Sequence, residues 1–517
     1  NPNPNPNPNP NPNPNPNAAE LSMIEESAGA MWALAADSPQ SSKEAIATSG
    51  AIGMLMNMLT NCNTKKSADN AAGGLAALAE KCLENIKTIV RAQVAAIGTR
   101  APPWRAIRLL SALALLCNTG KPSQDAVSHE ENVIKYLVDW LTTTNKEVQA
   151  QAARVTLALA SNNKGTQALV GNDGGIPPLV KLLEVKYMED GVLEAQRFSA
   201  MALWHLATLP KNRVAIEAAR GIKPLISMLA DDGEQVPLLA AMILVRHANH
   251  GSELIGAIVS AGGIIPLVNL LSSGTAASKQ MAASTLAAIG AVATNRDEIV
   301  AANAILPLVN LLKSHELGTP EAAARALASL ARADGEESAD DSGRKMLGGA
   351  HYRHASIHMA AGVKWLIHML DGSNLTKGEH RLKPPLTGGW PSLRVGVAGC
   401  HETEEMFPGS QVDFGVKIGM QEQGAQTIAE LAYGDYSMQD TIIELGGLAP
   451  LLSLVRSGSP AAQEFSARAL WYLSMQIHNQ RVFVTEAAVP DLVVLLKNGS
   501  PQAQMLAAAT LSEIAQG

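Results

Sequence analysis

The sequence predicts an all-α repeat protein in which short helices gain their burial by stacking on the next unit. One pattern recurs with a period of about 41 to 46 residues, and such a period with two or three helices per unit is typical of helical solenoids. The copies begin at Ala51, Val133, Gly175, Gly221, Gly263, Ala304, Gly362, Gly447 and Ala488. Apolar residues make up 47% of the chain but aromatic residues only 3%. We therefore expect a core of Ala, Leu, Ile and Val, with small Ala residues where helices cross.

The clearest copy of the pattern covers residues 262–290. Two glycines end the preceding element, and Pro266 stands where the first turn of a helix tolerates a missing N–H group. The apolar stripe that follows consists of Leu267, Val268, Leu270 and Leu271. After a polar turn, a second stripe recurs at helical spacing and consists of Met281, Ala282, Leu286, Ala287 and Ile289. Neither helix can bury its stripe alone, so each copy is expected to pack on its neighbours.

Several stretches depart from the regular period. One step is twice the usual length, which predicts a poorly patterned repeat near Ala92. An acidic, Gly/Ser-rich insertion falls at 334–350, and a longer one at 371–423 interrupts the turn between two helices. Residues 22–37 read as the last helix of a partial repeat. Residues 1–17 alternate Asn and Pro, so this low-complexity tail is expected to be extended and solvated, as a linker would be.

The repeated units resemble armadillo repeats. Residues 175–183, GIPPLVKLL, match the second helix of that repeat, and residues 199–207, SAMALWHLA, match its third helix. Residues 212–216 and 295–300 resemble its short first helix. The resemblance implies one right-handed armadillo-repeat superhelical solenoid over residues 18–517, with ten repeats and a partial N-terminal one.

Little in the sequence indicates catalysis. No phosphate-binding loop, nucleophile elbow or HExxH zinc motif is present, and the four cysteines, Cys62, Cys82, Cys117 and Cys400, have no CxxC spacing. The best metal candidate is His351, His354, His358 and His368, completed by Cys400 or His401, but ordinary partly exposed histidines explain this cluster better. The net charge of −7 gives no reason to expect non-specific binding of nucleic acid, and no apolar run is long enough to span a membrane. We expect no enzyme activity, cofactor or metal.

The resemblance also implies a binding surface, because the third helices of armadillo arrays line a groove. Two positions four residues apart on each third helix are expected to face it. None of these positions carries the Asn with which importin-α pins the backbone of a peptide, and Trp32 is the single Trp among them. The groove instead carries scattered cations and one tyrosine, namely Arg154, Arg197, His205, Arg246, Arg325, Arg468 and Tyr472. This set is similar to the β-catenin type of groove, which receives acidic extended or helical segments.

A second interpretation of these arginines is that they pair within the chain. Glu194, Glu321 and Glu464 each lie about one helical turn from one of them. Surface pairs of this kind stabilise by less than about 1 kcal/mol, so they could open for a partner.

The sequence therefore predicts a non-catalytic scaffold or adaptor that binds other proteins through the groove. The insertion 371–423 is either a second contact surface or a loop without contacts, and its Trp390, Phe407 and Phe414 favour contact. The alternatives are a structural subunit of a large assembly such as a ciliary or axonemal complex, the substrate-recognition part of a ubiquitin ligase, or an import adaptor. The expected compartment is the cytoplasm, with the cytoskeleton, the cilium or the nucleus as alternatives.

Overall fold

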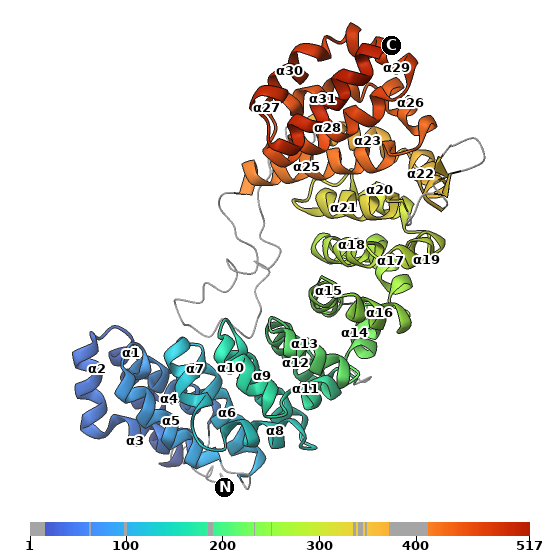
Figure 1. The fold of residues 1–517 in the computed structure, drawn as a ribbon. Coiled ribbons are helices and arrows are strands. Elements are labelled where there is room, and N and C mark those ends of the chain that lie inside the picture. Colours follow the sequence, from blue (N-terminus) through green and yellow to red (C-terminus); the bar gives the residue numbers. More distant parts are fainter. Residues whose placement is uncertain are drawn as a thin grey trace, which may run out of the picture. The chain divides into compact units, whose positions relative to one another are not determined.

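The chain folds into stacked helices, seen in a computed structural model. The residues that it describes are 16–61, 64–97, 101–184, 190–231, 233–249, 251–333, 338–339, 345–346, 349–371 and 412–516. Apart from one pair of two-residue strands, the regular elements of these residues are all helices. This confirms the all-α prediction. The helices form two compact units, residues 1–221 (unit 1) and residues 222–517 (unit 2), each described by itself (Figure 1). The single solenoid over 18–517 stays a prediction.

Unit 1 is a stack in which every repeat ends in a long helix. Its elements are α1 (Pro16–Ala36), α2 (Gln40–Ile46), the π-helix η1 (Ala47–Ala51), α3 (Ile52–Asn61), α4 (Lys65–Ala79), α5 (Leu83–Ile97), α6 (Pro103–Cys117), α7 (Lys121–Ser128), α8 (Val133–Leu141), α9 (Lys146–Ala160), α10 (Lys164–Asn172), α11 (Ile176–Leu183), α12 (Asp190–Leu206) and α13 (Pro210–Ala218). The third helices α1, α4, α6, α9 and α12 pack side by side in this order. In the poorly patterned repeat that the sequence predicts near Ala92, the single helix α5 takes the place of both the first and the second helix.

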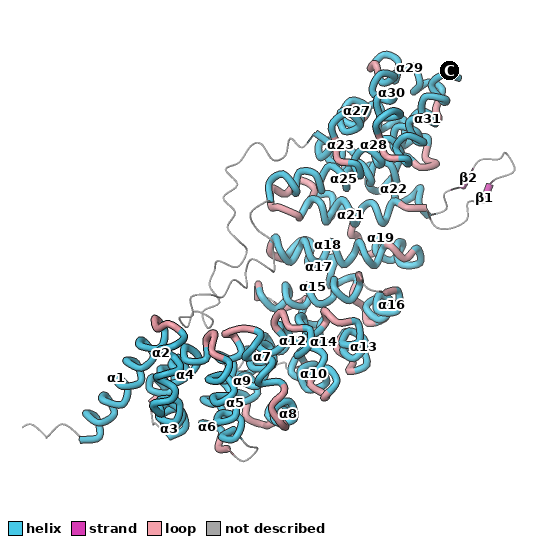
Figure 2. The backbone as a smooth tube through the Cα atoms, turned by 60° about the vertical axis from the view of Figure 1, so that its left-hand side comes forward, coloured by secondary structure: helices cyan, strands magenta, loops and turns pink. Residues whose placement is uncertain are grey.

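Unit 2 repeats the same arrangement (Figure 2). Its elements are α14 (Ile222–Met228), α15 (Gln235–Ala248), α16 (Ser252–Ser260), α17 (Ile264–Ser273), α18 (Ala276–Gly290), the 3-10 helix η2 (Ala293–Asn295), α19 (Arg296–Ala301), α20 (Ile305–Leu311), α21 (Thr319–Ala331), β1 (Ser338–Ala339), β2 (Lys345–Met346), α22 (Gly349–Met359), α23 (Gly362–Asp371), α25 (Val412–Ala432), α26 (Tyr436–Glu444), α27 (Leu448–Ser457), α28 (Pro460–Ser474), α29 (Ile477–Thr485), α30 (Ala488–Asn498) and α31 (Pro501–Gln516). The third helices α15, α18, α21, α25, α28 and α31 pack consecutively.

The two predicted insertions and the tail contain both described and undescribed residues. Strands β1 and β2 pair antiparallel within 334–350, with Ser338 opposite Met346. Helix α25 begins at Val412, inside the range 371–423. Helix α1 begins at Pro16, inside the predicted tail 1–17.

The ends of most third helices are capped by side chains from the element that follows them. In unit 1, Asn212 Nδ2 donates a hydrogen bond to the Leu206 carbonyl at 3.0 Å, and Arg213 Nη1 donates to the Ala207 carbonyl at 2.8 Å. Both donor residues are buried. The last carbonyls of a helix lack partners inside the helix, and a cation there also interacts favourably with the helix dipole. The polar pair therefore satisfies groups that the turn would otherwise bury unpaired.

The same capping recurs along the stack. Equivalent bonds run from Gln167 to Ala160, from Asn295 and Arg296 to Ile289 and Gly290, from Gln439 to Ala432, and from Asn479 and Gln480 to Leu473 and Ser474. The segments 212–216 and 295–300, which resemble first helices in the sequence, supply several of these donors. The structure shows that their leading polar residues hold consecutive repeats together.

This register survives the insertion that follows α21. Arg353 Nε donates to the Leu330 carbonyl at 2.6 Å, and His354 Nε2 lies 2.6 Å from the Ala331 carbonyl. Arg353 is fully buried and also contacts Asp297 Oδ1 at 2.7 Å. Helix α22 therefore docks on α21 as the other first helices dock on theirs, although residues 334–348 intervene in the sequence.

A second turn joins each first helix to the second. Gly262 takes a φ of 77°, and the Gly263 N–H donates to the Ile258 carbonyl at 3.0 Å. A Cβ on Gly263 would lie 2.7 Å from Ile258 Cγ2. In the next copy Ala304 replaces this glycine, and its bond to the Ile299 carbonyl lengthens to 3.4 Å. The glycines of the GIIPLV pattern therefore permit a closer turn.

The core is aliphatic, as predicted, and it includes two of the four cysteines. Cys82 and Cys117 are buried, and burial raises the pKa of the Cys117 thiol. Cys62 and Cys400 lie outside the described residues. No single described helix is long and apolar enough to cross a membrane, and the neighbours α16 and α17 pass that test only as a pair bent by 81°.

Replacing Arg353 with Met should destabilise unit 2 by roughly 3 kcal/mol, because the Leu330 and Arg332 carbonyls lose a buried donor. The matched control Arg325→Met removes an arginine from an exposed ion pair and should cost less than about 1 kcal/mol. Urea unfolding followed by circular dichroism measures both. Equal shifts of the two midpoints would show that the buried cap contributes no more than a surface pair.

Ala361 adopts the left-handed conformation, with a φ of 62°. This conformation costs an L-residue roughly 1–2 kcal/mol, a cost that glycine avoids. Glycine in turn loses more conformational freedom on folding, which costs about 0.5–1 kcal/mol relative to Ala. Ala361→Gly should therefore raise the melting temperature slightly. Ala360→Gly, one residue earlier and without a positive φ, should lower it. A stabilising Ala360→Gly together with a destabilising Ala361→Gly would contradict this account of the turn.

Candidate functional site

The candidate site is the face formed by the third helices of each unit, called here the third-helix face. In unit 1 it begins at α1, where Trp32 lies over α4. A Cβ added to Gly73 would lie 2.6 Å from a ring carbon of Trp32. The glycine therefore allows the indole to pack directly on the backbone of the next third helix. Trp32 remains partly exposed at this position.

Arg154 on α9 is the best placed cation of unit 1. It is half-buried, and it makes no hydrogen bond or ion pair with any residue that the structure describes. Burial lowers the pKa of its guanidinium, while Glu194 and Asp69 partly offset this effect. Burial raises the pKa of the Asp69 carboxyl group, and the nearby cations Lys65, Arg108 and Arg154 partly offset this increase. The region is thus partly desolvated, with cations from three third helices around one carboxylate.

The other two predicted residues of unit 1 lie on α12. Burial lowers the pKa of Arg197, and Glu194 opposes this shift. The His205 ring stands edge-on to Trp204 at 4.7 Å, and its Nε2 lies 3.5 Å from Ser161 Oγ. His205 therefore also takes part in the contact between neighbouring repeats.

In unit 2 the predicted cations lie on different third helices. Arg246 on α15 is half-buried, whereas Arg325 on α21 is exposed and pairs with Glu321 at 2.7 Å. Arg468 on α28 lies over the ring of Phe465 at 5.7 Å. Glu464 accepts a hydrogen bond from Ser500 Oγ. Of the pairs expected from the sequence in this unit, Glu321 with Arg325 thus forms an ion pair.

An aromatic cluster surrounds Tyr472 on the same face. Its ring lies 5.2 Å from the ring of Tyr433 on α25 and 5.2 Å from that of Trp471. All three side chains are partly exposed. Nearby, Arg332 Nε contacts Glu430 Oε1 at 3.3 Å and links the end of α21 to α25. The cluster offers a rigid, amphipathic contact surface next to the cation Arg468.

Some expected groove positions are covered. The buried ones are Gly73, Leu115, Ala158, Met201, Met242 and Ser329. These positions are closed to a partner, so the accessible part of the face is smaller than it would be with two exposed positions on every third helix. Among the residues expected in the insertion, Trp390 and Phe407 lie outside the described residues, and Phe414 lies in α25 with a side chain that is not described.

Sequence reasoning missed Trp104 at the start of α6. Its side chain is 49% exposed, and the guanidinium groups of Arg105 and Arg108 lie 5.8 and 5.3 Å from its ring centroid. The available signal was an aromatic residue between Pro103 and Arg105 in a chain with few aromatics. Exposed Trp and Arg together are the side chains that most often dominate protein interfaces.

Of the candidate metal ligands, Cys400 and His401 lie outside the described residues, and the side chain of His351 is not described. His354 is buried between the Ala331 carbonyl and Asp435 Oδ2, whereas His358 is exposed. Among the described residues, no group of three or more His, Cys, Asp or Glu side chains is arranged to hold a metal ion.

Comparison with known proteins gives three findings. The family model "Armadillo/beta-catenin-like repeat" matches residues 293–332 and 437–475. The human protein "Armadillo repeat-containing protein 3" is 30% identical over 204 residues, which are 38% of this chain and 22% of that protein. A solved structure of an engineered protein, Northeast Structural Genomics Consortium target OR497, has a TM-score of 0.70 and 25% identity, and covers 90% of this chain and 99% of its own.

These findings agree with the stacked three-helix units. The first family match runs from η2 through α21, and the second from α26 through α28, so each covers one first, second and third helix. The chain spans about a fifth of the length of the human relative, so that protein's activities do not carry over. The matched segments identify armadillo repeats at residues 293–332 and 437–475, and the chain as a whole is similar to armadillo-repeat proteins.

Proposed function

We propose that this chain is a non-catalytic scaffold that binds acidic protein segments on its third-helix face. Armadillo repeats are a general protein-binding scaffold. The observation that carries the finer proposal is Arg154, a half-buried cation without an ion-pair partner among the described residues. A carboxylate from a partner would regain part of the solvation that this guanidinium has lost, through a charge-assisted and bidentate hydrogen bond.

Neighbouring side chains support the same partner chemistry in unit 1. Trp32 and Trp104 provide exposed aromatic surface, and Arg105 and Arg108 flank the second indole. An acidic segment with apolar residues at intervals would satisfy both features, since rings bind the apolar residues and arginines bind the carboxylates.

Unit 2 presents a second, separate surface of the same kind. Arg325 is held by an exposed pair with Glu321, which stabilises by less than about 1 kcal/mol and so opens readily. Arg468 and the ring of Tyr472 lie one helical turn apart on α28. We treat the two surfaces as independent binding sites.

Neutralising the cations should weaken binding of an acidic peptide. We expect a fluorescein-labelled oligoglutamate peptide to bind with an affinity that falls as salt rises, because exposed charges are screened. Arg154→Gln in unit 1, and Arg325→Gln with Arg468→Gln in unit 2, should each weaken one phase of binding about tenfold, or ~1.4 kcal/mol. Fluorescence anisotropy measures the affinities, and circular dichroism checks that the helices remain.

Matched controls lie on helices away from the face. Arg91→Gln on α5 and Arg481→Gln on α29 remove exposed cations and should change the affinity by less than about twofold. Equal losses in the controls and in the face variants would mean that net charge alone attracts the peptide. The proposal would then be wrong, as it would be if an oligolysine peptide bound more tightly.

A further inference from the structure

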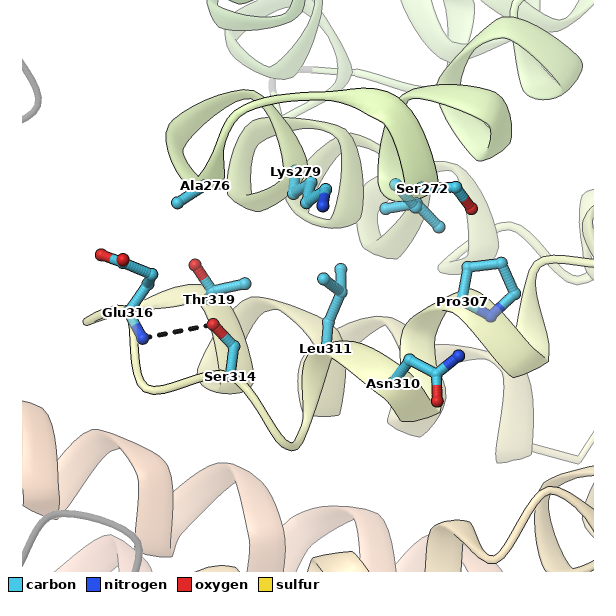
Figure 3. A pocket seen from close by; sticks show the side chains of 10 residues that line it. Ser272, Ala276, Lys279, Pro307, Asn310, Leu311, Ser314, Glu316 and Thr319 are labelled. Carbon is cyan, nitrogen blue, oxygen red and sulfur yellow. Dashed lines mark hydrogen bonds between the residues drawn. The ribbon is translucent and has the colours of Figure 1, made fainter. Parts of the chain in front are cut away.

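A pocket opens in unit 2 between two consecutive repeats. It has a volume of about 440 Å³, within the range of roughly 300–1,000 Å³ of small-molecule sites. Helices α17 and α18 form one side, and α20 and α21 form the other (Figure 3). The lining residues are Leu271, Ser272, Ala276, Lys279, Pro307, Asn310, Leu311, Ser314, Glu316 and Thr319. The pocket lies at the turns that join second to third helices, apart from the cations described above.

Comparison between the repeats of this chain shows what is unusual here. In some repeats, the side chain of a glutamine early in the third helix caps a carbonyl at the end of the second helix. Four such bonds run from Gln149 to Leu141, from Gln196 to Leu183, from Gln421 to Leu370 and from Gln463 to Val455. In α18 the residue equivalent to Gln463 is Lys279, and the carbonyl equivalent to that of Val455 belongs to Leu271, which lines the pocket. The pocket thus occurs where the capping glutamine is replaced by a cation.

Lys279 is a half-buried lysine with no hydrogen bond or ion pair to any residue in the described part of the chain. A half-buried ammonium group is usually paired with a carboxylate or hydrogen-bonded to another acceptor. Figure 3 shows its ammonium group directed into the space between the two helix pairs. An anionic ligand would supply the missing counter-charge.

Thr319 faces Lys279 from the other side of the pocket. It is 1% exposed, and its Oγ1 has no hydrogen-bond partner among the described residues. Figure 3 shows this hydroxyl directed across the pocket towards Ala276, on the side from which Lys279 also enters. Thr319 is also the first residue of α21, whose N-terminal end carries a partial positive charge and has no side-chain cap. A ligand oxygen that accepts a hydrogen bond from this buried hydroxyl would remove the cost of leaving it without a partner.

The rest of the lining restricts the anion. Leu271, Pro307 and Leu311 make one end of the pocket apolar. Asn310 Oδ1 already accepts a hydrogen bond from Lys313, so its amide nitrogen remains as a further donor. Glu316 is exposed at the edge, and its negative charge disfavours a dianion such as phosphate more than a monoanion.

We propose that this pocket binds a carboxylate that carries a short branched apolar chain. Lys279 and Thr319 would hold the carboxylate, and Leu271, Pro307 and Leu311 would contact the apolar chain. The C-terminal residue of a peptide ending in Leu and a small free carboxylic acid share this chemistry. The proposal does not depend on the acidic-segment surfaces, because it uses none of their residues.

The test is isothermal titration calorimetry with the full chain. The probes are acetyl-Gly-Leu with a free carboxylate, the same compound as its carboxamide, and 4-methylpentanoate. We expect saturable binding of the free acid below about 10 mM, and binding of the carboxamide weaker by about tenfold or more. Equal binding of 4-methylpentanoate would assign the site to small acids, and preference for the dipeptide would assign it to peptide C-termini; either result supports a carboxylate site.

Two variants and one control locate the site. Lys279→Gln introduces the residue found at this place in other repeats, so it should fold normally and weaken binding about tenfold. Thr319→Val should also weaken it, and Lys223→Gln, which removes an exposed lysine of α14, should leave it unchanged. Absence of saturable binding, unchanged affinity in Lys279→Gln, or tighter binding of inorganic phosphate than of the acids would overturn the proposal.

Discussion

The structure depends on a polar contact between repeats: buried side chains at the start of a first helix cap the end of the third helix before it. Hydrophobic stacking brings the helices together, but it is non-directional and does not decide how far one repeat is turned or shifted on the next. The caps fix this rotation and shift, because each donor forms a hydrogen bond with a particular carbonyl. Asn212 donates to the Leu206 carbonyl, and Arg213 donates to the Ala207 carbonyl. Asn212 also donates to the Gln167 carbonyl at 3.0 Å, which ties the contact to the first helix of the preceding repeat.

This arrangement explains why the repeats tolerate insertions. Arg353 and His354 reach the carbonyls of Leu330 and Ala331 although residues 334–348 lie between the two helices in the sequence. The contact needs only the correct pair of side chains on the docking helix, and the length of the connecting chain costs little entropy. Insertions can therefore vary at the turns while the stack of third helices, which carries the candidate binding surfaces, keeps its register.

Much of the fold was predictable from the sequence. The period, the second-helix pattern around Pro266 and the third-helix stripes all depend on local spacing, so they can be read without coordinates. The merged helix α5 and the cap made by His354 could not be predicted, because both depend on which groups come together in space. The sequence predicts a partly exposed histidine at His354, whereas the structure buries it.

The candidate site was less predictable for the same reason. Arg154 and Arg325 were both identified on third helices, but the sequence did not distinguish a half-buried guanidinium from an exposed ion pair. Trp104 was missed because it lies outside the two positions that the resemblance assigns to the groove. Lys279 was missed because it is notable only by comparison with the glutamines that cap the second helix in other repeats, and those hydrogen bonds are visible only in the structure.

Hydrogen–deuterium exchange of an Asn212→Ala variant tests most directly whether the first-helix caps fix one repeat on the next. Amide protection should fall at the end of α12 and across α13, while α1 and α4, with their own contacts, keep theirs. Unchanged protection in α12 and α13 would contradict this role of the caps, because apolar stacking alone would then suffice to hold these repeats in place.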